Sequence, residues 1–191
     1  STGGVSLSAS NTSLIDATIA AIALSASLSA GTGVGVGIGL SMARNYIGGT
    51  ASGGGSALDV IASINNSDVE AAQAISLSAI SDQEINAFVA AAAMAAALSG
   101  GTGVAVAGAG ALSSNRINTD VRAYAQGDAT GGDKLKGSAI SLTALDESVI
   151  DAFTGAAALA ATLAGGTGVS VSLAASIAKN EITGTVVGYI D

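Results

Sequence analysis

The chain has 191 residues and a formal net charge of −8 at neutral pH, and only 10% of its residues are charged. With six Lys or Arg residues it lacks the basic stripe that a nucleic-acid-binding protein needs, so we expect no nucleic acid as a partner. His and Cys are absent, which removes the commonest general base and any disulfide. No nucleophile motif stands out, so we expect neither enzymatic activity nor a cofactor.

The side chains are small, and this limits how the chain can fold. Gly accounts for 27 residues, whereas aromatic residues make up 3%. Such a chain buries surface by bringing backbones close together, because it has few large side chains to interlock. Pro is absent, which suits long hydrogen-bonded ladders, because Pro cannot donate a backbone hydrogen bond to them.

The opening segment, 1–47, predicts two strands joined by a corner. The segment SLSAS (6–10) alternates Ser with apolar residues, and residues 17–43 carry no charge. The second half of that run, VGVGIGLSM (34–42), alternates Gly with large apolar residues. This period of two indicates a strand whose Gly face allows another layer to approach closely. Between the two halves, Gly-Thr-Gly predicts a tight corner in which glycine adopts positive φ.

The same pattern recurs twice further along the chain. We therefore predict a single repeat array over 1–191, with copies at 6–75, 76–140 and, incomplete, 141–191. The length differences fall in two Gly-rich inserts, 48–56 and 127–134, which we predict to be surface loops. The corner glycines that align are Gly31, Gly33, Gly101, Gly103, Gly166 and Gly168.

The uncharged runs leave alternatives open. The Ala-rich segment AFVAAAAMAAAL (87–98) has high helix propensity, so a mixed α/β repeat with this run helical is one alternative. Each run is also long enough for a transmembrane segment. We expect no membrane insertion, because the runs consist of Ala, Gly and Ser, are broken by Gly-Thr-Gly, and lack flanking basic clusters.

The fold class that these patterns favour is all-β, as a parallel β-solenoid in which successive coils lay their strands above one another. Parallel ladders would then run along one axis at about 4.8 Å per rung. Because each copy is longer than an ordinary solenoid coil, we expect two or three coils per copy.

Two sets of polar residues align between the copies, and we predict structural roles for both. The first set stands where each uncharged run ends, and its amides would close a corner or stack on one another. The second set stands where each run begins, and its members would close a turn or cap a helix. The first set is Asn45, Asn115 and Asn180, and the second is Asp16, Asn86 and Asp151.

Calcium is the one metal that the sequence leaves possible. It would need several converging oxygen ligands, and the candidates are Asp128 and Asp133 in the second Gly-rich insert. The Gly- and Asp-rich calcium-roll repeat is missing, so no metal site is assigned with these residues. Gly-Thr-Gly is not a phosphate loop, because no Gly-Lys-Ser/Thr follows it.

The repeated pattern resembles tandem repeats of very large bacterial surface or secreted proteins of the haemagglutinin-like or adhesin-like kind. The residues that carry the resemblance are VIDAFTGAAALAATLAGGTGVSVSLAASIAKNEI (149–182) and its two counterparts. The resemblance implies an extracellular β-solenoid shaft or adhesive array, and it supplies no catalytic residues. The chain departs from calcium-loop and filamentous-haemagglutinin consensus patterns.

From these observations we expect a structural module of an elongated bacterial extracellular protein or self-assembling fibre. Its partners would be neighbouring repeats or other copies of itself, at the cell surface or outside the cell. One alternative is an adhesive module that binds a glycan or cell surface through the loops at 48–56 and 127–134. A further alternative is a membrane-inserting Gly/Ala-rich protein.

Overall fold

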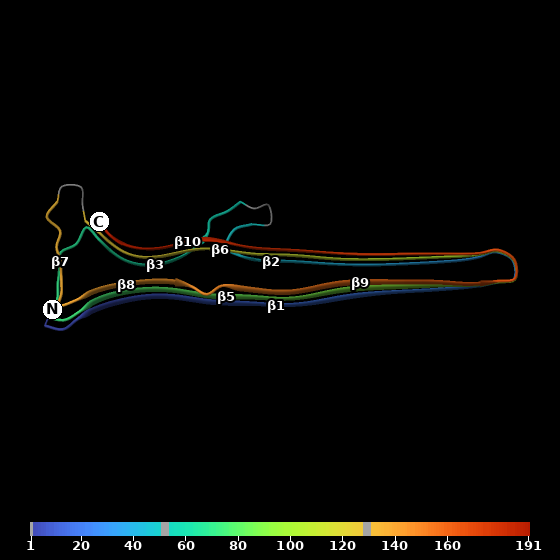
Figure 1. Cartoon of the computed structure of the whole chain (residues 1–191), viewed down its shortest axis with the longest axis horizontal. Helices are drawn as coiled ribbons and strands as arrows, with labels where there is room; N and C mark the ends of the chain where they lie inside the picture. Colours follow the sequence, from blue (N-terminus) through green and yellow to red (C-terminus); the bar gives the residue numbers. More distant parts are fainter. Residues whose placement is uncertain (1, 51–53, 128–130) are drawn as a thin grey trace.

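The computed structural model describes residues 2–50, 54–127 and 131–191, and within these ranges it contains strands and no helix (Figure 1). The all-β class and the parallel strand arrangement are thereby confirmed. The strands are β1 (Val5–Ser29), β2 (Gly33–Ile47), β3 (Leu58–Asn65), β4 (Val69–Glu70), β5 (Ile75–Ser99), β6 (Gly103–Gln126), β7 (Leu135–Lys136), β8 (Ile140–Asp146), β9 (Val149–Ala164) and β10 (Gly168–Ile190).

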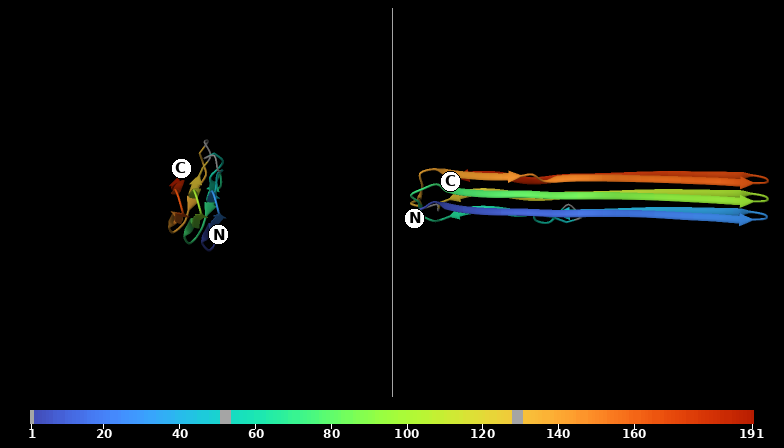
Figure 2. Two further views of the ribbon diagram at one scale, coloured as in Figure 1. Left: turned by 90° about the vertical axis from the view of Figure 1, so that its right-hand side faces the viewer. Right: turned by 90° about the horizontal axis from the view of Figure 1, so that it is seen from below.

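The strands form two long sheets that lie face to face. The outgoing sheet contains β1, β5, β8 and β9, and the return sheet contains β2, β3, β6 and β10. Neighbouring strands within each sheet are parallel and in register, whereas the chain reverses direction between the sheets at each corner (Figures 1 and 2). A third, short pair joins β4 to β7 near the two termini.

Each copy makes one circuit, not the two or three coils that its length suggested. It contributes one outgoing leg and one return leg, broken by a loop or a short gap in some copies. The outgoing leg of the first two copies is a strand of 25 residues. Long strands, rather than additional corners, therefore account for the length of each repeat.

The Ala-rich alternative of a helix over residues 87–98 is wrong, because this run lies within β5. Residues along β5 alternate between buried and more exposed positions, with Val89 and Ala91 facing the return sheet and Phe88 facing outward. The low exposure of the inward side chains comes from a second sheet that covers them. Tertiary packing therefore outweighs the high helix propensity of Ala.

The close approach of the sheets depends on glycine, as the alternation in 34–42 predicted. A β-carbon added to Gly35 would lie 2.5 Å from the Ala96 carbonyl oxygen, and one added to Gly37 would lie 2.6 Å from the Met94 carbonyl oxygen. No side chain larger than hydrogen fits there without moving a backbone. The Gly face of β2 is therefore the inner face, and its large residues point outward.

The corners do not use the positive φ that we predicted for them. Positive φ occurs among the described glycines in the loops, at Gly48, Gly49, Gly55, Gly131 and Gly132, and at none of the six corner positions. The corner needs glycine for a different reason. A β-carbon on Gly100 would lie 2.4 Å from the Ala30 carbonyl oxygen of the copy before it, and one on Gly165 would lie 2.5 Å from the Gly100 oxygen.

Candidate functional surfaces

The aligned asparagines lie on neighbouring strands inside the molecule. Asn45, Asn115 and Asn180 are register partners on β2, β6 and β10. The Asn45 amide donates to Oδ1 of Asn115 at 2.7 Å, and the Asn115 amide donates to Oδ1 of Asn180 at 2.8 Å. The three side chains thus form a one-way amide ladder across the return sheet. Its central member is 1% exposed, which suits a structural role because ladder partners satisfy buried amides.

A second buried polar belt lies further from the corners. The Thr119 hydroxyl donates to Oε1 of Gln83 at 2.8 Å, and the Gln83 amide reaches Oδ1 of Asn11 at 3.5 Å. Gln83 and Thr119 are both fully buried. The sequence did not predict this belt, because Gln83 has no counterpart of its own kind in the other copies.

The two polar belts divide the interior into apolar clusters of different character. On the corner side, the buried residues are small, with Val89 the largest and the rest Ala. On the side of the termini, they include Ile75, Leu77 and Val121. The molecule therefore has two ends with different packing, and we call residues 17–43, 85–115 and 152–178 the uncharged half and the remaining residues the charged half.

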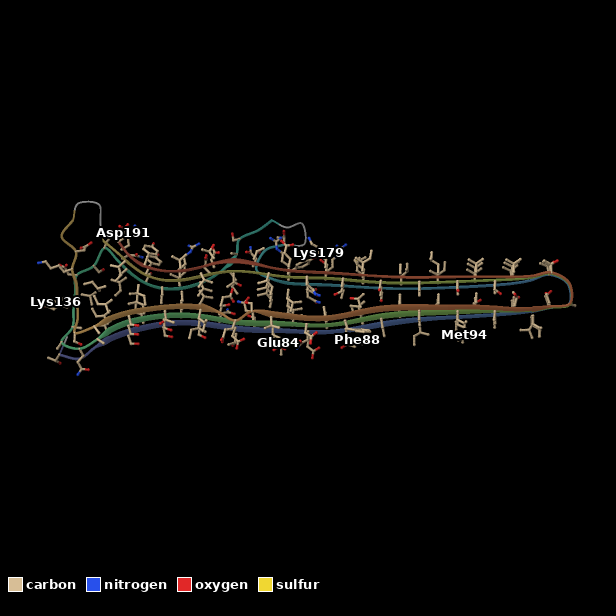
Figure 3. The ribbon with its side chains drawn as sticks, in the orientation of Figure 1. Glu84, Phe88, Met94, Lys136, Lys179 and Asp191 are labelled. Atoms are coloured by element: carbon tan, nitrogen blue, oxygen red, sulfur yellow. The ribbon has the colours of Figure 1, made fainter. Side chains whose placement is uncertain are left out.

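The outer faces of the uncharged half are apolar on both sheets. On the return sheet, Leu40 and Leu173 are each 73% exposed, and on the outgoing sheet Leu28 is 86% exposed. Figure 3 shows Phe88 and Met94 pointing away from the return sheet, with short side chains between the sheets. Large residues thus face outward and small residues face inward. The alternation with Gly had signalled two unlike faces, but periodicity alone does not say which face is outside.

The aligned acidic positions lie on the outer face of the outgoing sheet, at the boundary of the uncharged half. Asp16, Asn86 and Asp151 are register partners, and the Asn86 amide donates to Oε1 of Glu84 at 2.7 Å. They lie in a strand rather than at a turn or a helix start, so the predicted turn and cap roles are wrong. With Glu84 and Asp82 they make this outer boundary acidic; we call Asp16, Asp82, Glu84 and Asp151 the acidic collar.

The corresponding boundary on the return sheet is basic. Arg44, Arg116 and Lys179 point outward there, and Figure 3 shows Lys179 on the side opposite Glu84. Arg116 and Lys179 both contact Glu181, at 3.7 and 3.2 Å. We call Arg44, Arg116 and Lys179 the basic collar. The two outer faces therefore carry opposite charge at a similar distance from the corners.

The Gly-rich inserts join strands of the charged half, as predicted for loops. Described residues at 48–50 and 54–57 connect β2 to β3, and those at 127 and 131–134 connect β6 to β7. Asp133 lies beside a cavity of about 240 Å³ that Asp191 also lines, whereas Asp128 lies outside the described residues. No group of three or more carboxylates that could hold a metal ion occurs in the described ranges.

One ion pair on the surface of the charged half shifts two pKa values. Lys136 on β7 donates to Glu70 on β4. The hydrogen bond and charge of Lys136 lower the pKa of Glu70, and the same contact raises the pKa of Lys136. Both groups are fully exposed, so water screens the pair and its contribution to stability is small.

The two sheets are staggered, which leaves a different strand uncovered at each end. β2 packs against both β1 and β5, and β6 packs against both β5 and β9. Among the described strands, β10 packs against the outgoing leg of its own copy alone. Its inner face is correspondingly exposed along Gly168–Asn180. β1, at the opposite end, is likewise covered only by the return leg of its own copy in this part of the chain.

Comparison with known proteins adds no relative: no family model, no curated protein and no solved structure matches the chain. Within the described residues there is also no helix that is long and apolar enough to cross a membrane.

Proposed function

We propose that this chain is a structural module of a longer β-solenoid array, bacterial and extracellular, whose task is to bear load and present surfaces rather than to catalyse. The observation that carries the proposal is the stagger of the sheets. Because β10 at one end and β1 at the other each lack one covering strand, the two ends are complementary. A second molecule placed end to end with the first would repeat the packing that already joins neighbouring repeats within one chain.

The amide ladder has the polarity that such stacking requires. Within the described residues, Oδ1 of Asn45 and the amide nitrogen of Asn180 make no hydrogen bond. An end-to-end contact would place the amide nitrogen of Asn180 in one molecule beside Oδ1 of Asn45 in the next molecule. Each end is also large: a 25-residue edge spans about 80 Å, and two sheets about 10 Å apart give roughly 800 Å² per partner.

One residue opposes this contact. At the corner, the β-carbon position of each glycine points towards the copy before it, as the distances for Gly100 and Gly165 show. Ala30 occupies the equivalent position in the first copy. Its methyl group therefore projects into the space where a second molecule would stack on the first repeat, and it weakens end-to-end association.

Electron microscopy and sedimentation velocity test the proposal. We expect ribbons about 80 Å wide that lengthen with protein concentration, and we expect Ala30→Gly to lengthen them at equal concentration. Ser172→Lys should abolish them, because residue 172 is exposed on the inner face of β10 and becomes buried only in the stack. Monomers at all concentrations for both the unaltered chain and Ala30→Gly would reject the proposal.

A second candidate function is adhesion through the Gly-rich loops. The observation in its favour is that the described residues of this insert, 48–50 and 54–56, stand out from the return sheet between β2 and β3 (Figure 1). Deletion of residues 49–56 should then remove binding to a glycan array or to cells while leaving the fold intact. Unchanged binding after the deletion would reject this candidate.

A further inference from the structure

The outer faces of the uncharged half combine size, flatness and lack of charge. Residues 17–29 of β1 span about 43 Å, and three strands at about 4.8 Å each add about 14 Å of width. Each face therefore presents roughly 600 Å², the upper end of the largest apolar patch on an ordinary monomer. Patches of this kind on a folded protein mark an interaction surface.

The two faces differ in shape at their central strands, where Met94 projects from the outgoing sheet and Gly108 leaves a gap in the return sheet. The flanking register partners are large on both faces, with Leu24 and Leu159 beside Met94 and Ile38 and Leu173 beside Gly108. On the outgoing sheet, the register partners Leu24, Met94 and Leu159 form a ridge across the strands. On the return sheet, Gly108 and Gly110 leave a trough in the central strand. Beside Gly110, which the Leu40 side chain approaches, lies a cavity of about 290 Å³, and Gly108, two residues earlier on the same strand, does not line it. The cavity is lined by Leu40, Ser41, Met42, Gly110, Ala111, Leu112, Ala175 and Ile177.

Ridge and trough lie at the same level along the molecule. Gly37, whose added β-carbon would meet the Met94 carbonyl oxygen, is the register partner of Ala107, the residue next to Gly108. Met94 therefore points out of one face nearly opposite the point where Gly108 opens the other. A β-carbon on Gly108 would meet nothing within 4 Å, so the trough has room for a side chain from outside.

The charges at the boundary match in the same way. The stretch of β1 from Asp16 to its end at Ser29 is nearly as long as the stretch of β2 from its start at Gly33 to Arg44. Consider a second molecule in the same orientation, displaced along the direction perpendicular to the sheets. Its acidic collar would then lie near the basic collar of the first molecule. Like faces would instead bring like charges together, which disfavours that pairing.

We propose that the outer apolar faces of the uncharged half are a self-association surface, on which the outgoing sheet of one copy packs against the return sheet of a second. The contact would bury about 1,200 Å² in total, which reaches the lower bound for a specific stable interface. This lateral packing does not rest on end-to-end stacking, since it uses the faces of the sheets rather than their edges.

A lipid bilayer is the other apolar environment that could cover these faces, and the sheet edges argue against it. In a chain that is not stacked end to end, β1 and β10 each have one hydrogen-bonded neighbour strand. Their outer backbone groups would lose water in hydrocarbon, and each unpaired group is costly there. Face-to-face packing of two copies leaves those edges in water, so a second copy is the favoured occupant.

Cysteine cross-linking tests the arrangement, because the chain has no Cys of its own. A disulfide needs β-carbons about 3.8 Å apart, which residues on opposite outer faces of one molecule cannot provide. The variant Met94→Cys with Gly108→Cys should therefore give disulfide-linked dimers and higher oligomers on mild oxidation. The control, Ser78→Cys with Arg122→Cys, places two thiols on the outer faces of the same central strands in the charged half and should stay monomeric.

Three outcomes would overturn the proposal. One is equal cross-linking of the control pair, and another is cross-linking of either single variant as efficient as that of the double variant, since this would mean that like faces meet. The third is flotation of the unaltered chain with phosphatidylcholine vesicles together with loss of cross-linking when vesicles are added. Without any cysteine, Met94→Lys should weaken self-association at least about tenfold, whereas Ser8→Lys, on the outer face of the charged half and away from the collars, should not.

Discussion

The two halves of the molecule solve the same packing problem in opposite ways. In the charged half, Leu77 and Val121 are fully buried between the sheets, and serine lies on the outer face of β1. In the uncharged half, the interior is mostly Gly and Ala, with Val89 and Ile85 as its larger buried residues, while Leu40 and Leu173 face outward. The same strands continue through both halves, so the difference is one of sequence and not of topology. A parallel two-sheet stack therefore does not require a large-residue core.

The largest expected difference in stability between the halves comes from truncating one leucine in each of them. Leu77→Ala should lower the free energy of unfolding by about 2–5 kcal/mol, because it leaves a cavity in a filled interior. Leu40→Ala should change it by less than about 0.5 kcal/mol, because that side chain is already exposed. Urea denaturation at low protein concentration measures both. Equal losses for the two variants would remove the distinction between the halves.

Adding a methyl group to the return sheet should destabilise the fold on the inner face and not on the outer face. Gly37→Ala should destabilise by about 1–3 kcal/mol, because its β-carbon would meet the Met94 carbonyl oxygen. Gly108→Ala should be neutral or stabilise by up to about 1 kcal/mol, because the space is open and Gly weakens strands. Thermal unfolding of the pair measures the difference. A neutral Gly37→Ala would mean that the sheets are not in close contact there.

The amide ladder separates the halves, and its central member can be removed alone. Asn115→Ala should cost about 2 kcal/mol, because three side-chain hydrogen bonds are lost, one of them to the Ser113 hydroxyl, and the amide of Asn45 keeps a buried, unpaired donor. Ser114→Ala, its outward neighbour on the same strand, should change stability by less than about 0.5 kcal/mol. Chemical denaturation compares them. A loss no greater than that of the control would mean that the ladder contributes nothing.

The smallest expected effect is the pH dependence of the Glu70–Lys136 pair in the charged half. The lowered pKa of Glu70 stabilises the fold above the ordinary carboxyl pKa, and this contribution disappears as pH falls through the lowered value. The raised pKa of Lys136 stabilises the fold below its ordinary pKa and is lost as pH rises through the raised value. Lys136→Met should therefore alter the melting temperature only slightly at neutral pH. A large change would show that the pair is less screened than its exposure indicates.

The sequence predicted the strands because period-two alternation persists along SLSAS, VGVGIGLSM and their counterparts. It did not predict the single circuit per copy, because nothing in the composition of residues 17–29 marks how far one strand continues. It also misassigned the reason for glycine at the corners. Positive φ is a local property that sequence can suggest. The lack of room for a β-carbon on Gly100, which would lie 2.4 Å from the Ala30 carbonyl oxygen, arises only when the repeats stack.

The sequence predicted the alignment of the asparagines, but it did not predict the outer surfaces. The aligned asparagines could be found from the repeat, and the structure places them in one ladder. The acidic and basic collars could not be assigned to opposite faces, because Asp16 and Arg44 lie on different sheets and the sequence does not show which residues of each strand face outward. The ridge at Met94 and the trough at Gly108 depend on the relative level of the two sheets, which is a three-dimensional property.

In the uncharged half, large side chains face outward and small ones face inward. Thiol labelling of two adjacent positions on β2 tests this arrangement most directly. Leu40→Cys and Ser41→Cys place a single thiol on opposite faces of the same strand, at side chains that are 73% and 7% exposed. In dilute native protein, we predict that residue 40 reacts with a maleimide almost as fast as it does in urea, while residue 41 is strongly protected. Protection of residue 40 with rapid labelling of residue 41 would mean that the large residues lie inside, and it would contradict the account.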